Sequence, residues 1–370
     1  CARVGFVATL AAVAGHPPDQ PASIEPAETL ARLVRGETLA EDETRGLFDL
    51  LLTGRLDDTR IGALLALLQA RGPTVDELAG AARAMRARVT PVPYDASDDE
   101  ALVDTCGTGG AAKTFNVSTA AAIVAAACEP EAGSGVGRVV VAKHGNRSRT
   151  GRGSAEVLEA LGVNVDASPE VQAACLRDAG VCFCFAIRHH PAMRYAKGPR
   201  ASLGFPTIFN LLGPLTNPAG ATRQLIGVYA PHLVELVGRT LERLGAKAAL
   251  VTHSDDGLDE LSIGAASRTF ELGPTGVSAA DINPAALGLP PATPDQLRAE
   301  TVEDAAGAIR EVLSGEPGPR REIVRLNTAA GLRVAGAARS LEAGLELAAH
   351  AIDSGRAART LAELARRSQG

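Results

Sequence analysis

From residue 101 onward, short apolar runs alternate with Ala-rich stretches of helical periodicity, and this alternation is the strongest constraint on the fold. The apolar runs predict buried strands at 139–142, 181–186, 225–229, 248–251 and 323–326. The other stretches predict helices, among them 119–127, 155–161, 234–244 and 341–352. Strands that alternate with helices form mostly parallel sheets covered by helices. We therefore expect an α/β domain with a mostly parallel central sheet.

Residues 27–88 have a different pattern, in which apolar residues recur at helical spacing over short segments. Glycines follow the first segments at Gly36, Gly54 and Gly72, where helices commonly end. Thr74 and Glu77 have the spacing of a capping box at the start of the next helix. The pattern predicts a small all-helical N-terminal domain.

The chain of 370 residues is long enough for two domains. We assign residues 27–95 to the helical domain, completed by 189–215, and residues 96–188 and 216–370 to the α/β domain. Residues 1–26 are predicted to be an N-terminal extension. Their apolar stretch 4–14 resembles a targeting signal only weakly, because a single Arg precedes it.

The composition excludes several classes of protein. Hydrophobic residues make up 46% of the chain and charged residues 22%, which is typical of a globular protein. The net charge of −6 argues against a nucleic-acid partner, and no apolar run is long enough to span a membrane. The six cysteines include no CxxC pair, so we expect reduced thiols and a cytoplasmic protein.

The first polar motif runs from Gly107 through Thr108 to Gly109 and Gly110, directly after an apolar segment. Glycines allow the backbone to approach a ligand closely, and their amides can bind oxyanions. The segment 116–119, Asn-Val-Ser-Thr, then opens an Ala-rich helix. Hydroxyl groups at a helix start serve either as caps or as ligands for anions and Mg²⁺, and the combination with the glycines favours a ligand site.

The second motif, Lys-His-Gly-Asn-Arg-Ser at 143–148, follows the predicted strand 139–142. Ligands bind beyond the carboxyl ends of parallel strands. Lys143 would offer charge to a pyrophosphate, and Asn146 could accept a hydrogen bond from an amine. The alternative is a solvated polar loop.

A third polar motif places adjacent carboxylates, Asp259 and Glu260, after a turn at Gly257. Mg²⁺ binds one or two carboxylates together with water and substrate phosphates, whereas the alternative is an acidic surface turn. Arg200 could bind a carboxylate through two parallel hydrogen bonds. His189 and His190 are adjacent and cannot easily face one metal, so zinc is not expected.

Taken together, these motifs resemble the anthranilate phosphoribosyltransferases, enzymes of tryptophan synthesis. The resemblance extends over residues 27–365. Its most specific parts are the unchanged motif 143–148 and the run Asn-Leu-Leu-Gly-Pro-Leu-Thr-Asn-Pro at 210–218. His-Pro-Ala-Met at 190–193 and Asp-Gly-Leu-Asp-Glu at 256–260 also match.

The resemblance implies a fold like that of the nucleoside phosphorylases and a homodimer formed through the helical domain. It implies that phosphoribosyl pyrophosphate is bound by Gly107, Gly109, Gly110, Thr114, Asn116, Ser118, Thr119, Lys143, Ser148 and Ser154. Two Mg²⁺ ions would be held by Ser118, Asp259 and Glu260. Anthranilate would contact Gly107, His144, Asn146, His190 and Arg200, with Arg200 on its carboxylate.

The chain departs from the family pattern in two loops. The family's glycine loop continues Gly-Thr-Gly-Gly-Asp-Gly, whereas Ala111 and Ala112 follow Gly110 here and the segment is one residue shorter. The loop 149–153 is also one residue shorter than the Ser-rich loop of the family. We expect altered affinity or metal dependence rather than a different reaction.

Two other functions remain open at this stage. A pyrimidine nucleoside phosphorylase of the same fold would cleave a nucleoside with phosphate and would need neither Arg200 nor the Asp259–Glu260 pair. A protein that binds nucleic acid without catalysis would need a basic groove, which the net charge disfavours. For the transferase, an oxocarbenium-like transition state needs no protein nucleophile, and we assign no general base.

Overall fold

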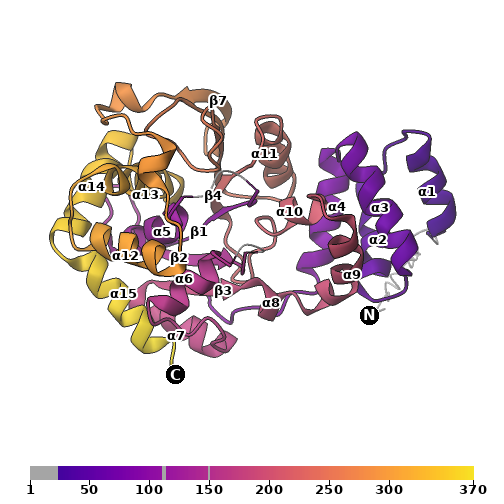
Figure 1. Ribbon diagram of the computed structural model, residues 1–370, viewed down its shortest axis with the longest axis horizontal. Helices are drawn as coiled ribbons and strands as arrows, with labels where there is room; N and C mark the ends of the chain where they lie inside the picture. The colour runs from indigo at the N-terminus through magenta and orange to yellow at the C-terminus, as the bar shows by residue number, and fades with distance from the viewer. Residues whose placement is uncertain (1–23, 111–113, 149–150) are drawn as a thin grey trace, which may run out of the picture.

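The computed structural model describes residues 24–110, 114–148 and 151–370. Figure 1 shows two parts, a group of helices at one end of the molecule and a sheet covered by helices at the other. Most of the N-terminal extension predicted at 1–26 lies outside the described residues. Across those residues, none of the helices is both long and apolar enough to cross a membrane.

The helical part begins with the helices that the sequence predicts. They are α1 (Pro26–Val34), α2 (Glu41–Leu52), α3 (Asp58–Arg71) and α4 (Val75–Arg86). Asp57 caps α3 by accepting a hydrogen bond from the Arg60 N–H. The capping box at α4 is confirmed, because Thr74 and Glu77 each accept the other's backbone N–H. Glu77 is fully buried and also accepts the Leu39 N–H, so this cap ties α4 to the start of α2.

A later segment of the chain returns to these helices. It comprises α8 (Ala186–His189), the short 3₁₀ turn η1 (Pro191–Met193), α9 (Arg194–Leu203) and α10 (Ile208–Leu212). Helix α9 packs against α3, and α10 packs against α4 (Figure 1). The rings of Phe48 and Phe209 lie 5.8 Å apart in the shared core. Residues far apart in the sequence thus complete one helical core.

The second part is built on a sheet of order β3-β2-β1-β4-β5-β6-β7. Its strands are β1 (Glu100–Gly107), β2 (Arg138–Gly145), β3 (Val181–Phe185), β4 (Arg223–Gly227), β5 (Ala248–Ser254), β6 (Ser267–Gly273) and β7 (Gly276–Ile282). The pairs from β3 through β5 are parallel, whereas β5–β6 and β6–β7 are antiparallel. The predicted mostly parallel sheet is confirmed.

Alternate residues of the central strands face two separate cores. Leu225 and Leu250 join the core beneath α5 (Val117–Ala127) and α13 (Pro319–Ala335). Ile226 and Val251 instead join the core that contains α11 (Leu233–Arg243) and the helical part. The remaining elements are α6 (Ser154–Ala160), α7 (Pro169–Ala179), η2 (Pro284–Leu287), η3 (Pro294–Leu297), α12 (Val302–Leu313), α14 (Leu341–Asp353) and α15 (Arg356–Arg367).

The predicted helices at 119–127, 155–161, 234–244 and 341–352 are confirmed as α5, α6, α11 and α14. The predicted strand at 323–326 is wrong, because these residues lie inside helix α13. Ile323, Val324 and Leu326 are fully buried, and a helix buried on several sides has an apolar run that looks like a buried strand. Strand β2 is longer than predicted and continues through Gly145.

Candidate active site

The three polar motifs meet at one edge of the sheet. Strands β1, β2 and β4 end at Gly107, Gly145 and Gly227, and β5 ends at Ser254. Because β2, β1, β4 and β5 are neighbours and run parallel, their carboxyl ends lie side by side. This edge is where α/β sheets bind ligands.

Two paired glycines form the floor beneath Asp259. Gly107 and Gly227 lie opposite each other on β1 and β4. A Cβ on Gly107 would lie 2.5 Å from Asp259 Oδ2, and a Cβ on Gly227 would lie 1.4 Å from the Asp259 carbonyl oxygen. Only glycine leaves room for Asp259 at this position. Beyond them, Gly109 and Gly110 have φ angles of 66° and 99°, which favour glycine.

The start of α5 presents polar atoms that do not serve as helix caps. Asn116 is the N-cap residue, has left-handed backbone angles (φ 68°, ψ 52°) and makes no side-chain cap bond. Its Oδ1 and the Oγ1 of Thr119 are buried and lack a hydrogen-bond partner among the described residues. Unpaired buried polar atoms and a non-glycine residue with positive φ are both costly and concentrate at functional sites. The structure thus favours the ligand-site interpretation of 116–119 over simple capping.

Lys143 lies within strand β2 rather than in a loop after it. Its side chain is buried, and Nζ donates to the Thr105 carbonyl oxygen at 2.7 Å and to Ser118 Oγ at 3.2 Å. Burial lowers the pKa of Lys143, and the nearby carboxylates oppose this effect. The lysine therefore connects the second motif to the hydroxyl of Ser118.

The acidic pair faces the same place from the loop after β5. Burial raises the pKa of Asp259 and, together with the charge of Asp259, raises the pKa of Glu260 well above its ordinary value. Both residues keep some exposed surface, but the Oε2 atom of Glu260 is fully buried and has no partner among the described residues. The backbone N–H groups of Gly109 and Ser118 interact with Asp259 and Glu260, respectively.

The donor set fits a magnesium ion that is shared with a phosphorylated substrate. Within the described residues, no cluster of three or more His, Cys, Asp or Glu side chains could hold a metal by itself. Mg²⁺ needs fewer protein ligands, because it takes one or two carboxylates with water and substrate phosphates. A cation would also offset the repulsion between the neighbouring carboxylates and would give the buried Glu260 Oε2 a partner, which it lacks among the described residues.

His144 and His190 form a pair with defined proton positions. His144 Nδ1 lies 2.9 Å from the Gly213 carbonyl oxygen and must donate its proton there. The Nε2 atoms of the two rings are 3.2 Å apart, so His190 Nε2–H donates to the unprotonated Nε2 of His144. Burial lowers the pKa of His144 to about 4 and that of His190 to about 2. Both rings are therefore neutral at pH 7.

Arg200 belongs to the returning segment of the chain. It lies in the last turn of α9, with its guanidinium carbon 5.2 Å from the ring centroid of Phe209 on α10. Burial lowers the pKa of Arg200, and no carboxylate among the described residues offsets this. Gly213, the partner of His144, directly follows α10. Helix α10 thus connects Arg200 to the histidine pair.

The other predicted residues lie in the segments before α5 and after β2. Asn146 is exposed, and its Oδ1 accepts the Arg147 N–H. Ser154 begins α6, and a Cβ on Gly145 would lie only 2.3 Å from its Oγ. Thr114 is buried, and Ser148 is partly buried. Of the two loops that depart from the family pattern, residues 111–113 of the glycine loop and residues 149–150 of the loop 149–153 lie outside the described residues.

Sequence reasoning missed Asp104 as a site residue. Asp104 is fully buried in β1, and its Oδ1 accepts the His144 N–H at 3.0 Å. Asn217 hydrogen-bonds the same carboxylate and donates to the Ala142 carbonyl oxygen. Asp104 therefore fixes the strand position of Lys143 and His144. The signal that could have identified Asp104 was an ionisable residue within an apolar segment of the sequence.

Known proteins resemble the chain over nearly its whole length. Residues 27–89 match the helical bundle domain of the glycosyl transferase family, and residues 99–358 match its a/b domain. The anthranilate phosphoribosyltransferase of Thioalkalivibrio sulfidiphilus is 48% identical over 331 residues, covering 88% of this chain and 94% of that protein. That of Moorella thermoacetica is 46% identical over 334 residues, covering 90% of this chain and 95% of that protein.

Solved structures agree with this relationship. The anthranilate phosphoribosyltransferase of Thermus thermophilus has a TM-score of 0.83 at 40% identity, covering 92% of this chain and 99% of that one. The Saccharomyces cerevisiae enzyme, solved in complex with PRPP and Mg, has the same fold, with a TM-score of 0.82 at 23% identity over 93% of this chain and 98% of that one. With close relatives of one kind and both family domains matched in order, the chain belongs to the anthranilate phosphoribosyltransferases.

Proposed function

We propose that this protein transfers the phosphoribosyl group of phosphoribosyl pyrophosphate to the amine of anthranilate, with Mg²⁺, in tryptophan biosynthesis. The products are N-(5-phosphoribosyl)anthranilate and pyrophosphate. The observation that carries the proposal is the set of buried oxygens on Asn116, Thr119 and Glu260 that have no partner among the described residues, together with the buried ammonium of Lys143. The enzyme from yeast, whose fold is the same, was solved with PRPP and Mg bound.

The phosphoribosyl pyrophosphate site in this proposal lies between the glycine loop and the start of α5. Gly107, Gly109 and Gly110 face the phosphates, and Asn116 and Thr119 supply buried polar atoms that have no partner among the described residues. Thr114, Ser148 and Ser154 border this region. Ser118, Asp259 and Glu260 would hold two Mg²⁺ ions, which would neutralise charge on the pyrophosphate oxygens.

Anthranilate binds on the other side of strand β2, beside the histidine pair. Arg200 binds its carboxylate, because a half-buried guanidinium without an ion pair among the described residues has strong capacity for a carboxylate. The neutral rings of His144 and His190 border the apolar part of the molecule. Gly107 and Asn146 complete this site in the proposal.

The reaction is a substitution at C1 of the ribose. The nitrogen lone pair of anthranilate forms the new C1–N bond while the C1–O bond breaks and its electrons leave with pyrophosphate. Lys143 offsets part of the negative charge that develops on the leaving group. The nitrogen then loses a proton to water, and we assign no general base, since the neutral histidines have pKa values far below 7. Alignment of the two substrates supplies much of the rate.

We further propose a cytoplasmic homodimer formed through the helical part. Three large apolar side chains are exposed there, Val34 at 70%, Ile187 at 63% and Phe205 at 42%. Exposed apolar groups of this size are typical of interfaces when they gather on one face. Size-exclusion chromatography with light scattering would test the dimer, and Val34→Lys with Phe205→Lys should give a monomer.

The decay of anthranilate fluorescence tests the reaction. With phosphoribosyl pyrophosphate and Mg²⁺ we expect complete decay, and EDTA should stop it. Uridine or thymidine with inorganic phosphate serves as the control for a nucleoside phosphorylase and should give no cleavage. A folded protein that leaves anthranilate unchanged at every Mg²⁺ concentration would contradict the proposal.

A further inference from the structure

A cavity lies at the opposite edge of the sheet from the proposed active site. Its volume is about 350 Å³, within the range of small-molecule sites. It is lined by the end of α4, the segment 89–92, the segment 217–222 that leads into β4, and the turn 244–246 before β5. These segments meet at the amino ends of β4 and β5. Strand β4 has five residues, so the two edges are roughly 15 Å apart.

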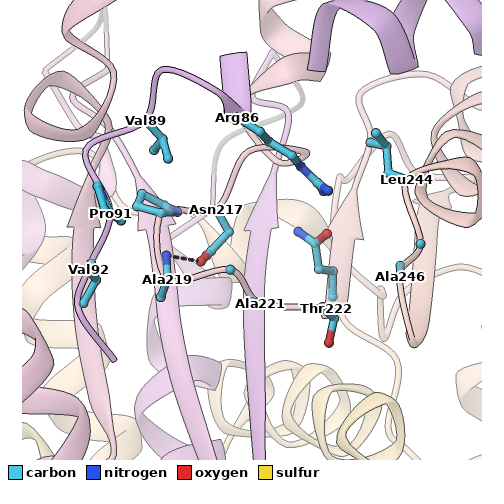
Figure 2. Close-up of a pocket in the computed structure, with 14 residues that line it drawn as sticks. Arg86, Val89, Pro91, Val92, Asn217, Ala219, Ala221, Thr222, Leu244 and Ala246 are labelled. Atoms are coloured by element: carbon cyan, nitrogen blue, oxygen red, sulfur yellow. Dashed lines mark hydrogen bonds between the residues drawn. The ribbon is translucent and has the colours of Figure 1, made fainter. Parts of the chain in front are cut away.

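Arg86 is the charged group of this cavity. Figure 2 shows its guanidinium pointing into the space between Asn217 and Leu244. Its Nε donates to the Leu215 carbonyl oxygen at 2.7 Å, so the two terminal nitrogens remain for other partners. Arg83, one turn earlier, is paired with Glu41, but no carboxylate within the described residues pairs with Arg86.

The burial of Arg86 makes the missing partner significant. Burial lowers the pKa of Arg86, and the nearby charge of Arg83 lowers it further. A largely buried guanidinium without a counter-ion is costly, and one anion would remove that cost. Of the described residues that line the cavity, only Arg86 is charged. The cavity therefore has a net positive charge.

The rest of the lining is mainly apolar. It consists of Val89, Pro91, Val92, Pro218, Ala219, Ala221, Leu244 and Ala246, with Asn217, Thr222 and Gln224 as the polar side chains. Asn217 already accepts the Ala219 N–H (Figure 2) and donates to the Ala142 carbonyl oxygen. Gln224 already donates to the Pro214 carbonyl oxygen. These amides are committed to the fold, which leaves the guanidinium fork as the main recognition group.

We propose that this cavity binds a small carboxylate with an apolar body, held by the terminal nitrogens of Arg86. A carboxylate matches the planar guanidinium with two parallel hydrogen bonds. A single guanidinium does not offset the charge of a polyphosphate, and a neutral apolar ligand leaves the guanidinium unpaired. Since the walls come from two of the connections between the helical part and the sheet, those after α4 and after α10, the ligand would bridge the two parts.

Binding of benzoate, measured by equilibrium dialysis, tests the site. The measurements use an Arg200→Gln background, so that the anthranilate site does not contribute. We expect saturable binding there, weakened about tenfold or more by Arg86→Gln. Arg60→Gln removes an exposed charge on α3 and is the matched control, with binding unchanged. Equal benzoate binding with and without the Arg86 guanidinium would overturn the proposal.

A second variant separates loss of binding from loss of folding. Ala246→Leu adds volume at the half-buried rim of the cavity and keeps Arg86, so it should also weaken binding. Benzamide has the same shape without the charge and should bind at least about tenfold more weakly than benzoate. Equal affinity for benzamide would refute recognition of a carboxylate. Displacement of benzoate by inorganic phosphate at equal concentration would show a general anion site and overturn the specific proposal.

Discussion

Replacing Gly227 by alanine should test whether the paired glycines of β1 and β4 hold the acidic loop in place. The new Cβ would lie 1.4 Å from the Asp259 carbonyl oxygen and 2.4 Å from its carbonyl carbon. Non-bonded carbon and oxygen atoms approach to about 3.3 Å, so the backbone at Asp259 must move by roughly 2 Å. Backbone cannot rotate away as a side chain can. The displaced loop would carry Glu260 away from Ser118 and Lys143.

The expected magnitudes follow from this displacement. Steric overpacking of a tight core costs about 1–3 kcal/mol of unfolding free energy. A misplacement of about 1 Å can lower the rate about 100-fold, so Gly227→Ala should lose at least that factor in kcat. Gly107→Ala meets Asp259 Oδ2 at 2.5 Å, and that side chain can rotate. It should lower kcat strongly while costing less than about 1 kcal/mol of stability.

Guanidinium unfolding and the fluorescence assay measure the two effects separately. Gly307→Ala in α12 is the matched control, because among the described residues no atom beyond its chain neighbours and its own helix backbone lies within 4 Å of the new Cβ, and its φ is not positive. Alanine in a helix interior is favoured over glycine by about 0.8–1.0 kcal/mol, so this variant should be slightly more stable and fully active. If Gly227→Ala is as active and as stable as Gly307→Ala, the steric reasoning is wrong.

Three further predictions concern charge. The pKa of His144 is about 4 in the folded protein and ordinarily 6.5, so the unfolded state binds more protons between these pH values and stability falls as the pH drops through this window. Between pH 7 and pH 4 the protein should lose roughly 3 kcal/mol more unfolding free energy than the His144→Asn variant, as measured by urea unfolding. Arg200→Ala should raise the KM for anthranilate about tenfold or more and leave that for phosphoribosyl pyrophosphate unchanged, and steady-state kinetics that show an unchanged anthranilate KM would remove Arg200 from that site. Asp259→Asn combined with Glu260→Gln should abolish Mg²⁺-dependent turnover in the fluorescence assay, and retained activity would place the metal elsewhere.

Local sequence signals predicted the elements whose boundaries are set locally. The caps at Asp57 and Thr74 fix the starts of α3 and α4, since each cap bonds a backbone group within three residues. The error at 323–326 came from burial, because α13 packs against both α5 and α14 and its apolar face is too wide to show a helical period. The antiparallel β6–β7 hairpin was missed because β7 is mostly exposed and lacks an apolar run.

The candidate site was predictable where a polar residue interrupts an apolar pattern. Lys143 stands out in this way because it follows an apolar run, whereas Glu260 lies in an acidic segment whose role came from the family resemblance. The structure brings the surroundings of both residues together at one edge of the sheet. The partners of these residues could not be predicted, because they depend on pairing between strands. Asp104 and His144 are far apart in the sequence and meet only through the β1–β2 register. The cavity at Arg86 is equally non-local, since its walls come from separate segments.

The end of strand β2 also divides the proposed site into two halves. Lys143 turns toward Ser118, whereas His144, the next residue, turns toward His190 and Gly213. Successive side chains of a strand point to opposite faces, so one dipeptide supplies the phosphate half and the aromatic half. Inserting one residue before Lys143 would turn each of these two side chains to the opposite face of the sheet, and both half-sites would be lost. A change of loop length after Gly145 leaves the two side chains on their present faces. The arrangement makes the strand register a condition for the two substrates to meet, and it leaves the following loop free to diverge among relatives.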